Sequence, residues 1–597
     1  MRHLLRNALV TSGALGLLLT SGTAVSGAAV RTDGSDENIP SVCGDRRPDD
    51  PGPGTYGMQL DGSFRHPDLT PAGEERFSFP GGAKDLFPKT KGYDPGSYTE
   101  GPIKVEAAYR GPQFTPDYFH TWQNIVDFDG RRYLFQYDRS AGRVYDVTDV
   151  RKVKIVESLS RDDVKVEYGE NVELHKSKDW DAYDYWGAST IQWSPSLKAY
   201  VMVQSFEQKR QVGELGDSVE HSKFHNADGV KKLREQTSFK GFKVYRLDGP
   251  RKKDWKLLST VTTDASYADP LNAAPGAHQG SGSLDVPYWT GGKYMFIAAA
   301  PLDTWSNTEA PTYLYSAGYQ AYDMSDPAKP RKVGEWHRKG QLASESAAYA
   351  KNPRCGNQTS WMGARMPLFI PKPVEEGGKY AFAALGGFGL SVLDISNPAD
   401  MKEIAHLELP MSVGGTEADN VDVSQYEKTG MVYVSGYPLG EDCHEPYKDV
   451  FQIDARDPRA PRIVGALPRP KPVAGAKFAD YCQRGGSFGP KRSGAYTSPG
   501  DPAQGLLPYA FYNAGVQFFD TTDPRKPKIA AQFVPSGFSK GVPDYALGNQ
   551  THAIYVEWDR KLVWVFTNDG IYAVSSKKLL GAPTLTGPAA PFRNSAR

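Results

Sequence analysis

Three side chains that can transfer protons occupy one register before three short β-rich segments of the chain. His120, Tyr185 and His278 each lie five residues before the first residue of such a segment. The segments span residues 125–128, 190–193 and 283–286. The same step on two later segments reaches Gly415 and Gly548, so the register itself does not demand an aromatic ring. Because imidazoles suit general bases and phenols suit general acids, the pattern predicts a proton-transfer site.

Cationic and hydrogen-bonding side chains occur near the loops that carry these residues or beyond the following strands. They are Lys209, Arg210, Arg365, Arg484, Asn549 and His552. A guanidinium can donate two parallel hydrogen bonds to a carboxylate, and amide and imidazole groups supply further donors. We therefore expect this set to bind an anionic substrate.

The cysteines allow two interpretations. In an exported protein, Cys43, Cys355, Cys443 and Cys482 most simply form two disulfides, whose pairing the sequence does not fix. Alternatively, Cys355, Cys443, His444 and Cys482 would supply three thiolates and one imidazole to a structural zinc ion. The wide separation of these residues along the chain favours disulfides.

One short pattern recurs along the chain and indicates its architecture. A hydrophobic residue, an aromatic residue or Leu, and Asp are followed by a hydrophobic residue, Ser or Thr, and Asp or Asn, usually before Pro. Clear copies span 144–149, 321–327, 392–398 and 518–524, and weaker copies span 244–248, 451–458 and 571–575. Asp and Ser side chains bond nearby backbone N–H groups, so the repeated Asp has a structural explanation. Seven copies beside β-rich runs predict an all-β, seven-bladed β-propeller of four-stranded antiparallel blades.

This fold would bring the candidate residues together. In a propeller the innermost strand of each blade borders the central channel, and the loops leading into these strands converge on one face. We assign the innermost strands to 125–128, 190–193, 283–286, 420–423 and 553–556. The proton-transfer residues would then share a space with the cationic ones.

Two family resemblances follow from these residues. The repeated strand resembles the LVIVD-repeat propellers. His120, Tyr185 and His278 are similar in type and register to the catalytic residues of the seven-bladed polysaccharide lyases, namely the ulvan lyases and the lyases that release rhamnose from glucuronate. That resemblance implies β-elimination beside a uronic acid, with His120 as base, Tyr185 as acid and His278 as an orienting or second proton-transfer residue.

The chain departs from the lyase pattern at the residue that neutralises the uronate. In the ulvan lyases an Arg is expected on the strand after the Tyr, whereas this chain has residues 200–204, Tyr-Val-Met-Val-Gln, at that place. Arg365 or Arg484 would have to replace it from across the channel.

The two ends of the chain and its charge define the remaining organisation. A basic start and a short apolar run indicate an export signal over 1–28, so we expect a secreted, extracellular protein. We assign 29–109 to an N-terminal arm packed on the ring and 110–597 to the propeller.

Lys plus Arg and Asp plus Glu both number 70, so no overall electrostatic field favours the binding of nucleic acid. We expect a monomer that does not enter membranes.

Three functions compete. The first is a lyase that cleaves an acidic polysaccharide or oligosaccharide beside glucuronate or iduronate and needs no cofactor for catalysis. The second is a non-catalytic LVIVD-repeat propeller that binds a protein or a cell-wall glycan, which the fold supports equally well. The third is an oxidase whose channel histidines hold a metal, for which Tyr185 would be a poor ligand.

Overall fold

The computed structural model describes the chain between residues 97 and 587, with gaps. The described ranges are 97–109, 122–137, 141–160, 183–208, 238–262, 287–299, 318–339, 363–364, 366–410, 416–438, 447–484, 487–494, 498–535, 551–567 and 570–587. Within these ranges, no helix is long and apolar enough to cross a membrane.

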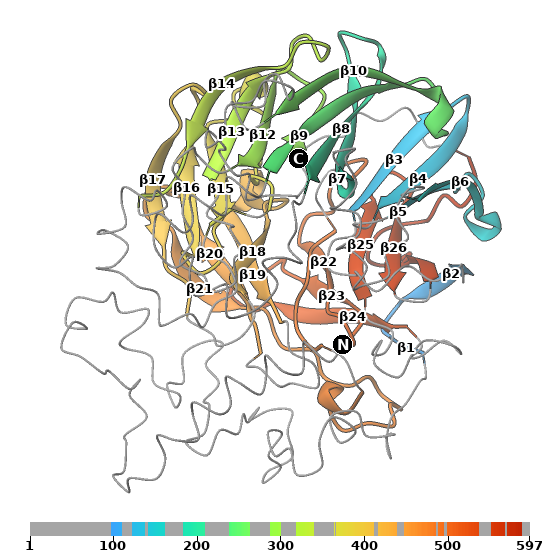
Figure 1. The fold of residues 1–597 in the computed structure, drawn as a ribbon. Coiled ribbons are helices and arrows are strands. Elements are labelled where there is room, and N and C mark those ends of the chain that lie inside the picture. Colours follow the sequence, from blue (N-terminus) through green and yellow to red (C-terminus); the bar gives the residue numbers. More distant parts are fainter. Residues whose placement is uncertain are drawn as a thin grey trace, which may run out of the picture.

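The described strands form seven small antiparallel sheets arranged in a ring, which confirms the predicted seven-bladed β-propeller (Figure 1). From the inner strand outward, blade 1 contains β3 (Trp122–Phe128), β4 (Arg131–Tyr137), β5 (Ala141–Asp146) and β6 (Lys154–Ser160), blade 2 contains β7 (Tyr183–Ser194), β8 (Ala199–Gln208), β9 (Ser238–Leu247) and β10 (Trp255–Thr262), and blade 3 contains β11 (Tyr288–Trp289), β12 (Tyr294–Ala299), β13 (Gly318–Asp323) and β14 (Arg331–Trp336).

The other blades follow the same order with two shortened inner strands. Blade 4 contains β15 (Tyr380–Ala384), β16 (Leu390–Asp394) and β17 (Lys402–Leu407), blade 5 contains β18 (Thr416–Asp422), β19 (Met431–Tyr437), β20 (Val450–Asp454) and β21 (Arg462–Ala466), blade 6 contains β22 (Leu506–Ala510), β23 (Val516–Asp520), β24 (Lys528–Val534) and β1 (Tyr98–Glu100), and blade 7 contains β25 (Thr551–Glu557), β26 (Leu562–Thr567), β27 (Gly570–Ser575) and β2 (Lys104–Tyr109). Single bridges, Phe369 to Phe382 and Ser493 to Tyr509, occupy the inner positions of blades 4 and 6.

The repeated sequence pattern marks the third strand of every blade, as predicted. In the turns after these strands, the Asp carboxylate accepts a hydrogen bond from the backbone N–H two residues later. This bond is 3.0 Å from Thr148 to Asp146, 2.9 Å from Ser325 to Asp323 and 3.0 Å from Thr522 to Asp520. The repeated Asp therefore shapes turns between the third and fourth strands.

The N-terminal strands complete two blades, and this changes the boundary expected after residue 109. β2 pairs with β27 as the outer strand of blade 7, whose other strands come from the C-terminal end of the chain. β1 pairs with β24 at the outer edge of blade 6. Residues 98–109 thus belong to the propeller, because backbone hydrogen bonds join the two ends of the chain. The expected export signal and residues 29–96 lie outside the described residues.

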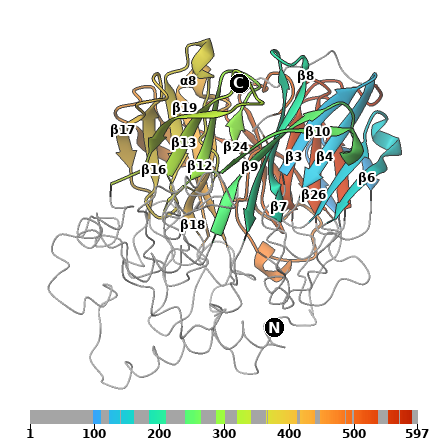
Figure 2. The same cartoon turned by 45° about the horizontal axis from the view of Figure 1, so that its top comes forward.

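The two faces of the ring carry different strand ends. We call the face at which the inner strands begin the loop face, and the face at which they end the turn face. Helix α8 (Tyr426–Thr429) follows inner strand β18 on the turn face, at the top of Figure 2, and η10 (Tyr481–Arg484), the short orange helix, lies toward the opposite face. Asp129 and Gly130 make a tight turn at the turn face with φ values of 50° and 71°, which suit the twist of a hairpin.

Apolar side chains interleave between neighbouring sheets and form the core. Phe135 of blade 1 packs in one cluster with Met202 of blade 2, and Leu134 packs in another with Trp564 of blade 7. Both faces of a blade are covered by its neighbours, so β26 is buried along its full length. Burial on both faces explains why such strands have continuous apolar runs instead of alternating ones.

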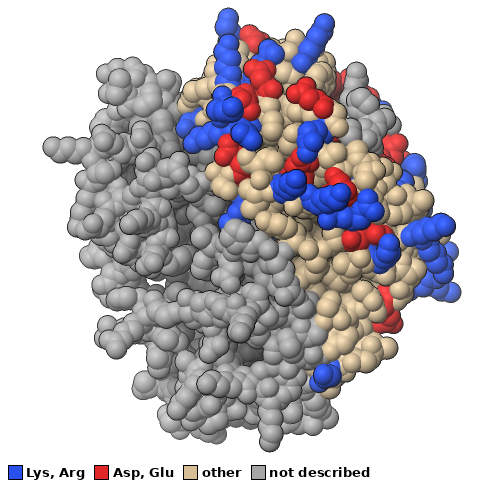
Figure 3. Space-filling model, turned by 90° about the vertical axis from the view of Figure 1, so that its right-hand side faces the viewer, with Lys and Arg blue, Asp and Glu red and all other residues tan. Residues whose placement is uncertain are grey.

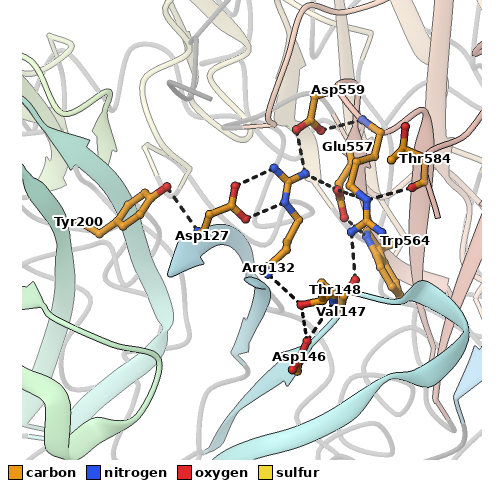
Figure 4. Close-up of polar contacts among 11 residues, drawn as sticks. Asp127, Arg132, Asp146, Val147, Thr148, Tyr200, Glu557, Asp559, Trp564 and Thr584 are labelled. Atoms are coloured by element: carbon orange, nitrogen blue, oxygen red, sulfur yellow. Dashed lines mark hydrogen bonds and ion pairs between the residues drawn. The ribbon is translucent and has the colours of Figure 1, made fainter. Parts of the chain in front are cut away.

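A buried guanidinium connects the first blade with the last at the turn face (Figure 4). The Asp129–Gly130 turn places Arg132 opposite Asp127, and both carboxylate oxygens of Asp127 accept hydrogen bonds of 2.9 Å from Nε and Nη2. Nη1 of Arg132 donates to Glu557 at 2.7 Å and to Asp559 at 2.8 Å in blade 7. Arg132 is fully buried, so its charge depends on these three carboxylates.

A second buried arginine and the C-terminal segment surround this ion cluster. Arg560 donates to the carbonyl groups of Val147 in blade 1 and Thr584 after blade 7, each at 3.0 Å. Glu557 also accepts a 2.6 Å hydrogen bond from the indole of Trp564. Arg132, Glu557 and Arg560 therefore each have partners from more than one segment of the chain, which offsets part of the cost of removing their charges from water.

Replacing Arg132 with Met should lower the free energy of unfolding by about 3–5 kcal/mol, because three carboxylates would lose a shared buried cation. The neighbouring Arg131 provides a matched control, since its side chain is 55% exposed and pairs with Asp146. Arg131→Met should cost less than about 1 kcal/mol. Urea denaturation of both variants measures the difference, and equal losses would contradict the role assigned to Arg132.

Asp559→Asn should change how stability depends on pH. Burial raises the pKa of Asp559 to about 6, although Arg132 opposes the shift. A carboxyl whose pKa is higher in the folded than in the unfolded protein binds extra protons between about pH 4 and 6, and its contribution to stability falls as pH rises through 6. The unfolding free energy of the variant, minus that of the natural protein, should therefore increase by about 2–3 kcal/mol as the pH rises from 4 to 8. Parallel stability curves for the two proteins would contradict this assignment.

Candidate functional site

Most of the sequence-predicted site residues lie outside the described residues. They are His120, Lys209, Arg210, His278, Cys355, Arg365, Cys443, His444 and Asn549, together with the remaining cysteine, Cys43. Tyr185 lies in β7, where pairing with β8 is irregular between Asp184 and Ser189, but its side chain is not described. The same holds for Cys482 in η10. The catalytic set, and both interpretations of the cysteines, stay predictions.

The predicted inner strands agree with the structure in four of the five blades. Residues 125–128, 190–193 and 553–556 lie within β3, β7 and β25, and residues 420–423 overlap β18. In blade 3 the predicted segment 283–286 lies outside the described residues, and the described inner strand is β11, Tyr288–Trp289.

Arg484 is buried and binds backbone groups on the loop-face side of blade 6. Its Nη1 donates a 2.6 Å hydrogen bond to the carbonyl of Asn513, and its Nη2 donates to the carbonyl of Pro535. The side-chain amide of Asn513 donates back to the carbonyl of Tyr481 at 2.8 Å. We infer that Arg484 joins η10 to the connections after β22 and β24, which differs from the substrate-binding role expected from the sequence.

His552 lies at the loop-face end of the inner strand of blade 7, on the face predicted from the sequence. It is the second residue of β25 and is buried. Its ring meets the ring of Tyr512 edge to face, with centroids 5.7 Å apart and an interplanar angle of 88°. His552 thereby joins blade 7 to the connection between β22 and β23 of blade 6.

Two buried basic residues lie on the shortened inner strand of blade 6. The backbone N–H of Lys491 donates to Ala510 at 2.8 Å, and the N–H of Ala510 donates to Arg492 at 2.9 Å, which places both residues beside the loop-face end of β22. Nζ of Lys491 is 3.5 Å from the ring centroid of Tyr437 and 5.9 Å from that of Tyr512. Nη2 of Arg492 lies 3.5 Å from the sulfur of Met366.

The backbone of Tyr512 adopts a conformation that L-residues rarely adopt. Its φ is 43°, in the left-handed region, and Gly515 follows with a φ of 71°. The turn is closed by hydrogen bonds from Phe511 to Gly515 and from Gly515 to Tyr512, and Thr551 of blade 7 donates to the Tyr512 carbonyl at 2.9 Å. A strained residue persists only where its surroundings fix it, and such residues cluster at functional sites.

We call Tyr437, Lys491, Arg492, Tyr512 and His552 the loop-face cluster. All five side chains are buried, and they come from blades 5, 6 and 7. Buried charges act through a lower dielectric than surface charges do, so their fields are stronger. The cluster thus combines two cations, an imidazole and two phenols, groups that can stabilise an anion and transfer protons.

Other buried polar groups link blades 5 and 6. Asp419 of β18 is buried. Tyr509 of β22 accepts a 2.9 Å hydrogen bond from the amide of Asn420 in β18 and contacts the hydroxyl of Ser435 in β19. Burial raises the pKa of Tyr509, so its phenol stays neutral and links blade 5 to blade 6. Among the described residues, no group of three or more His, Cys, Asp or Glu could hold a metal ion.

The sequence revealed only one member of the loop-face cluster, His552. Lys491 and Arg492 follow a Gly-Pro pair and lack the apolar alternation that marks a strand. Tyr437 and Tyr512 read as ordinary aromatic core residues. The turn-forming Asn513 and Gly515 after Tyr512 were the available signal for an unusual backbone.

One family model matches part of the chain. Residues 374–407, from η9 (Val374–Glu376) through β17, match the LVIVD repeat family. No curated protein matches the chain.

Two solved structures of Sqt1 from Chaetomium thermophilum are similar to it. One, bound to the N-terminus of the ribosomal protein L10, has 11% identity and a TM-score of 0.36 over 80% of this chain and 100% of its own. The other has 10% identity and a TM-score of 0.35 over 81% of this chain and 97% of its own.

Replacement of Arg484 should destabilise the protein whether or not the positive charge is kept. Arg484→Lys and Arg484→Met should each lower the free energy of unfolding by about 1–3 kcal/mol for every buried carbonyl left without a donor. The ammonium of Lys cannot bridge the carbonyl groups of Asn513 and Pro535, and Met donates to neither. Thermal and urea unfolding measure the loss. A Lys variant of natural stability that has lost ligand binding would instead support the role expected from the sequence.

Proposed function

We propose that this protein is a secreted lyase that binds an acidic polysaccharide at the loop face and cleaves it beside a uronic acid by β-elimination. The observation that carries the proposal is the loop-face cluster, in which the ammonium of Lys491 lies near the rings of Tyr437 and Tyr512, and the ring of Tyr512 contacts His552. Such a reaction needs a cation for the uronate, a base for a carbon-bound proton and an acid for the leaving oxygen. The cluster contains all three types of group.

The proposed reaction balances without a redox partner. A base removes the proton from C5 of the uronate, and the electron pair of that bond forms a double bond between C4 and C5. The bond between C4 and O4 breaks, and an acid gives a proton to O4. The negative charge that develops beside the C6 carboxylate is the charge that a buried cation stabilises.

The proposal keeps His120 as base, Tyr185 as acid and His278 as the orienting or second proton-transfer residue. Lys491 and Arg492 replace Arg484 as the cations that favour the uronate, since the guanidinium of Arg484 binds backbone carbonyls. Both are buried, so they act through the field of a charge in a low dielectric.

Tyr512 and His552 are a second phenol and imidazole whose rings touch on this face. Variants of this pair and of the pair His120 and Tyr185 are therefore needed to assign the base and the acid.

The test is absorbance at the ultraviolet band of an unsaturated uronate while the purified protein is incubated with a panel of uronate polysaccharides. Absorbance should increase with the natural protein. The rate of this increase should be about 10²–10⁴-fold lower in variants of the true acid and base. The variants are His120→Ala, Tyr185→Phe, Tyr512→Phe and His552→Ala. Lys491→Met should lose about 100-fold, while Lys471→Met, which alters an exposed lysine, should match the natural protein.

Two other outcomes would favour the competing functions. Binding of a glycan without any growth in absorbance, by a correctly folded protein, would favour the non-catalytic propeller. Growth that tracks bound copper or iron would favour the oxidase.

A further inference from the structure

A group of basic side chains lies on the rim of blades 1 and 2, away from the loop-face cluster. Its members are Arg151, Lys152, Lys154, Arg251, Lys252 and Lys253, all exposed. The first three belong to η2 (Val150–Lys152) and the start of β6, and the others lie in or beside η4 (Lys252–Asp254). We call this group the rim patch.

Equivalent turns of adjacent blades build the rim patch. Both η2 and η4 connect the third strand of a blade to the fourth, so both lie at the turn face. The backbone N–H of Lys252 donates a 3.1 Å hydrogen bond to Glu157 of β6, which joins the second turn to the outer strand of blade 1. The basic residues of the two turns therefore lie on neighbouring blades at the same face of the ring.

Positive charge exceeds negative charge on this surface. The acidic residues of the same turns and of the strand that joins them are Asp149, Glu157, Asp248 and Asp254, against six basic ones. Asp149 is itself paired with Arg151 at 3.2 Å and lies 3.9 Å from Lys152. Figure 3 shows Lys and Arg side chains projecting from the right-hand side of the molecule as drawn in Figure 1, with Asp and Glu interspersed among them. Because the whole chain is electrically balanced, this excess is local.

We propose that the rim patch binds a linear acidic polysaccharide through its carboxylate or sulfate groups. The six side chains extend over two blades, so a polymer with regularly spaced charges can pair with several of them at once, whereas a single small anion cannot. Exposed ion pairs are individually weak, and many contacts along one polymer give useful affinity.

The surface fits a polysaccharide better than a nucleic acid. Among the described residues, the exposed large hydrophobics are Val105, Leu257 and Val464, so no exposed aromatic ring offers a platform for stacked bases. Leu257 is 50% exposed and follows η4 in sequence, which adds an apolar contact beside the charges. The patch and the loop-face cluster lie at opposite ends of the strands, so binding at the rim does not depend on the proposed cleavage.

The test is binding of the full-length protein to immobilised heparin and polygalacturonate, with uncharged dextran as the blank. The natural protein should bind both acidic polymers, and the affinity should fall steeply as salt rises. The double variant K252Q/K253Q should bind about fivefold more weakly, and so should R151Q/K154Q. Neutralising substitutions avoid placing a new negative charge beside Glu157.

A matched control is available in blade 6. Arg525 and Lys526 occupy the corresponding turn between the third and fourth strands, and both are exposed. R525Q/K526Q removes the same charge and should retain natural affinity. Equal losses in the control and the rim variants, all with unchanged melting temperature, would overturn the proposal. Tighter binding to a duplex DNA fragment than to either polysaccharide would overturn the choice of partner.

Discussion

The buried guanidinium of Arg132 joins the first blade to the last and so closes the ring. A propeller closes only if its last blade packs on its first, and Arg132 of blade 1 there binds Asp127 beside it and Glu557 and Asp559 of blade 7. Strand β2 joins the same two parts of the chain through backbone hydrogen bonds at the outer edge of blade 7. Together these contacts fix the inner strands around the channel, so the positions of all loop-face side chains depend on them.

The sequence predicted the parts of this molecule that repeat. The recurring pattern located the third strand of every blade. In the copies that carry the Asp, its side chain closes the following turn, which needs the same residues each time. Inner strands with four or more β-forming residues, such as β3 and β25, were also predictable. The LVIVD match over residues 374–407 rests on the most regular of these copies.

The features that occur once could not be predicted. Arg132 and Glu557 are distant in sequence, and nothing in an Asp-Gly turn followed by two arginines says which guanidinium is buried. The inner strand of blade 6 is too short to show a period, which concealed Lys491 and Arg492. Arg484 looked like a ligand-binding residue because its carbonyl partners, Asn513 and Pro535, are backbone groups that carry no sequence signal.

In the proposed protein, cleavage takes place at the loop face, and the opposite rim gives the polymer a second binding surface. A crystal structure of the Tyr185→Phe variant with a short uronate oligosaccharide would locate the cleavage site. We expect a uronate ring at the loop-face mouth of the channel, with its carboxylate directed toward Lys491 and Arg492 of blade 6. An oligosaccharide seated only on the turn face, with the loop-face mouth empty, would contradict it.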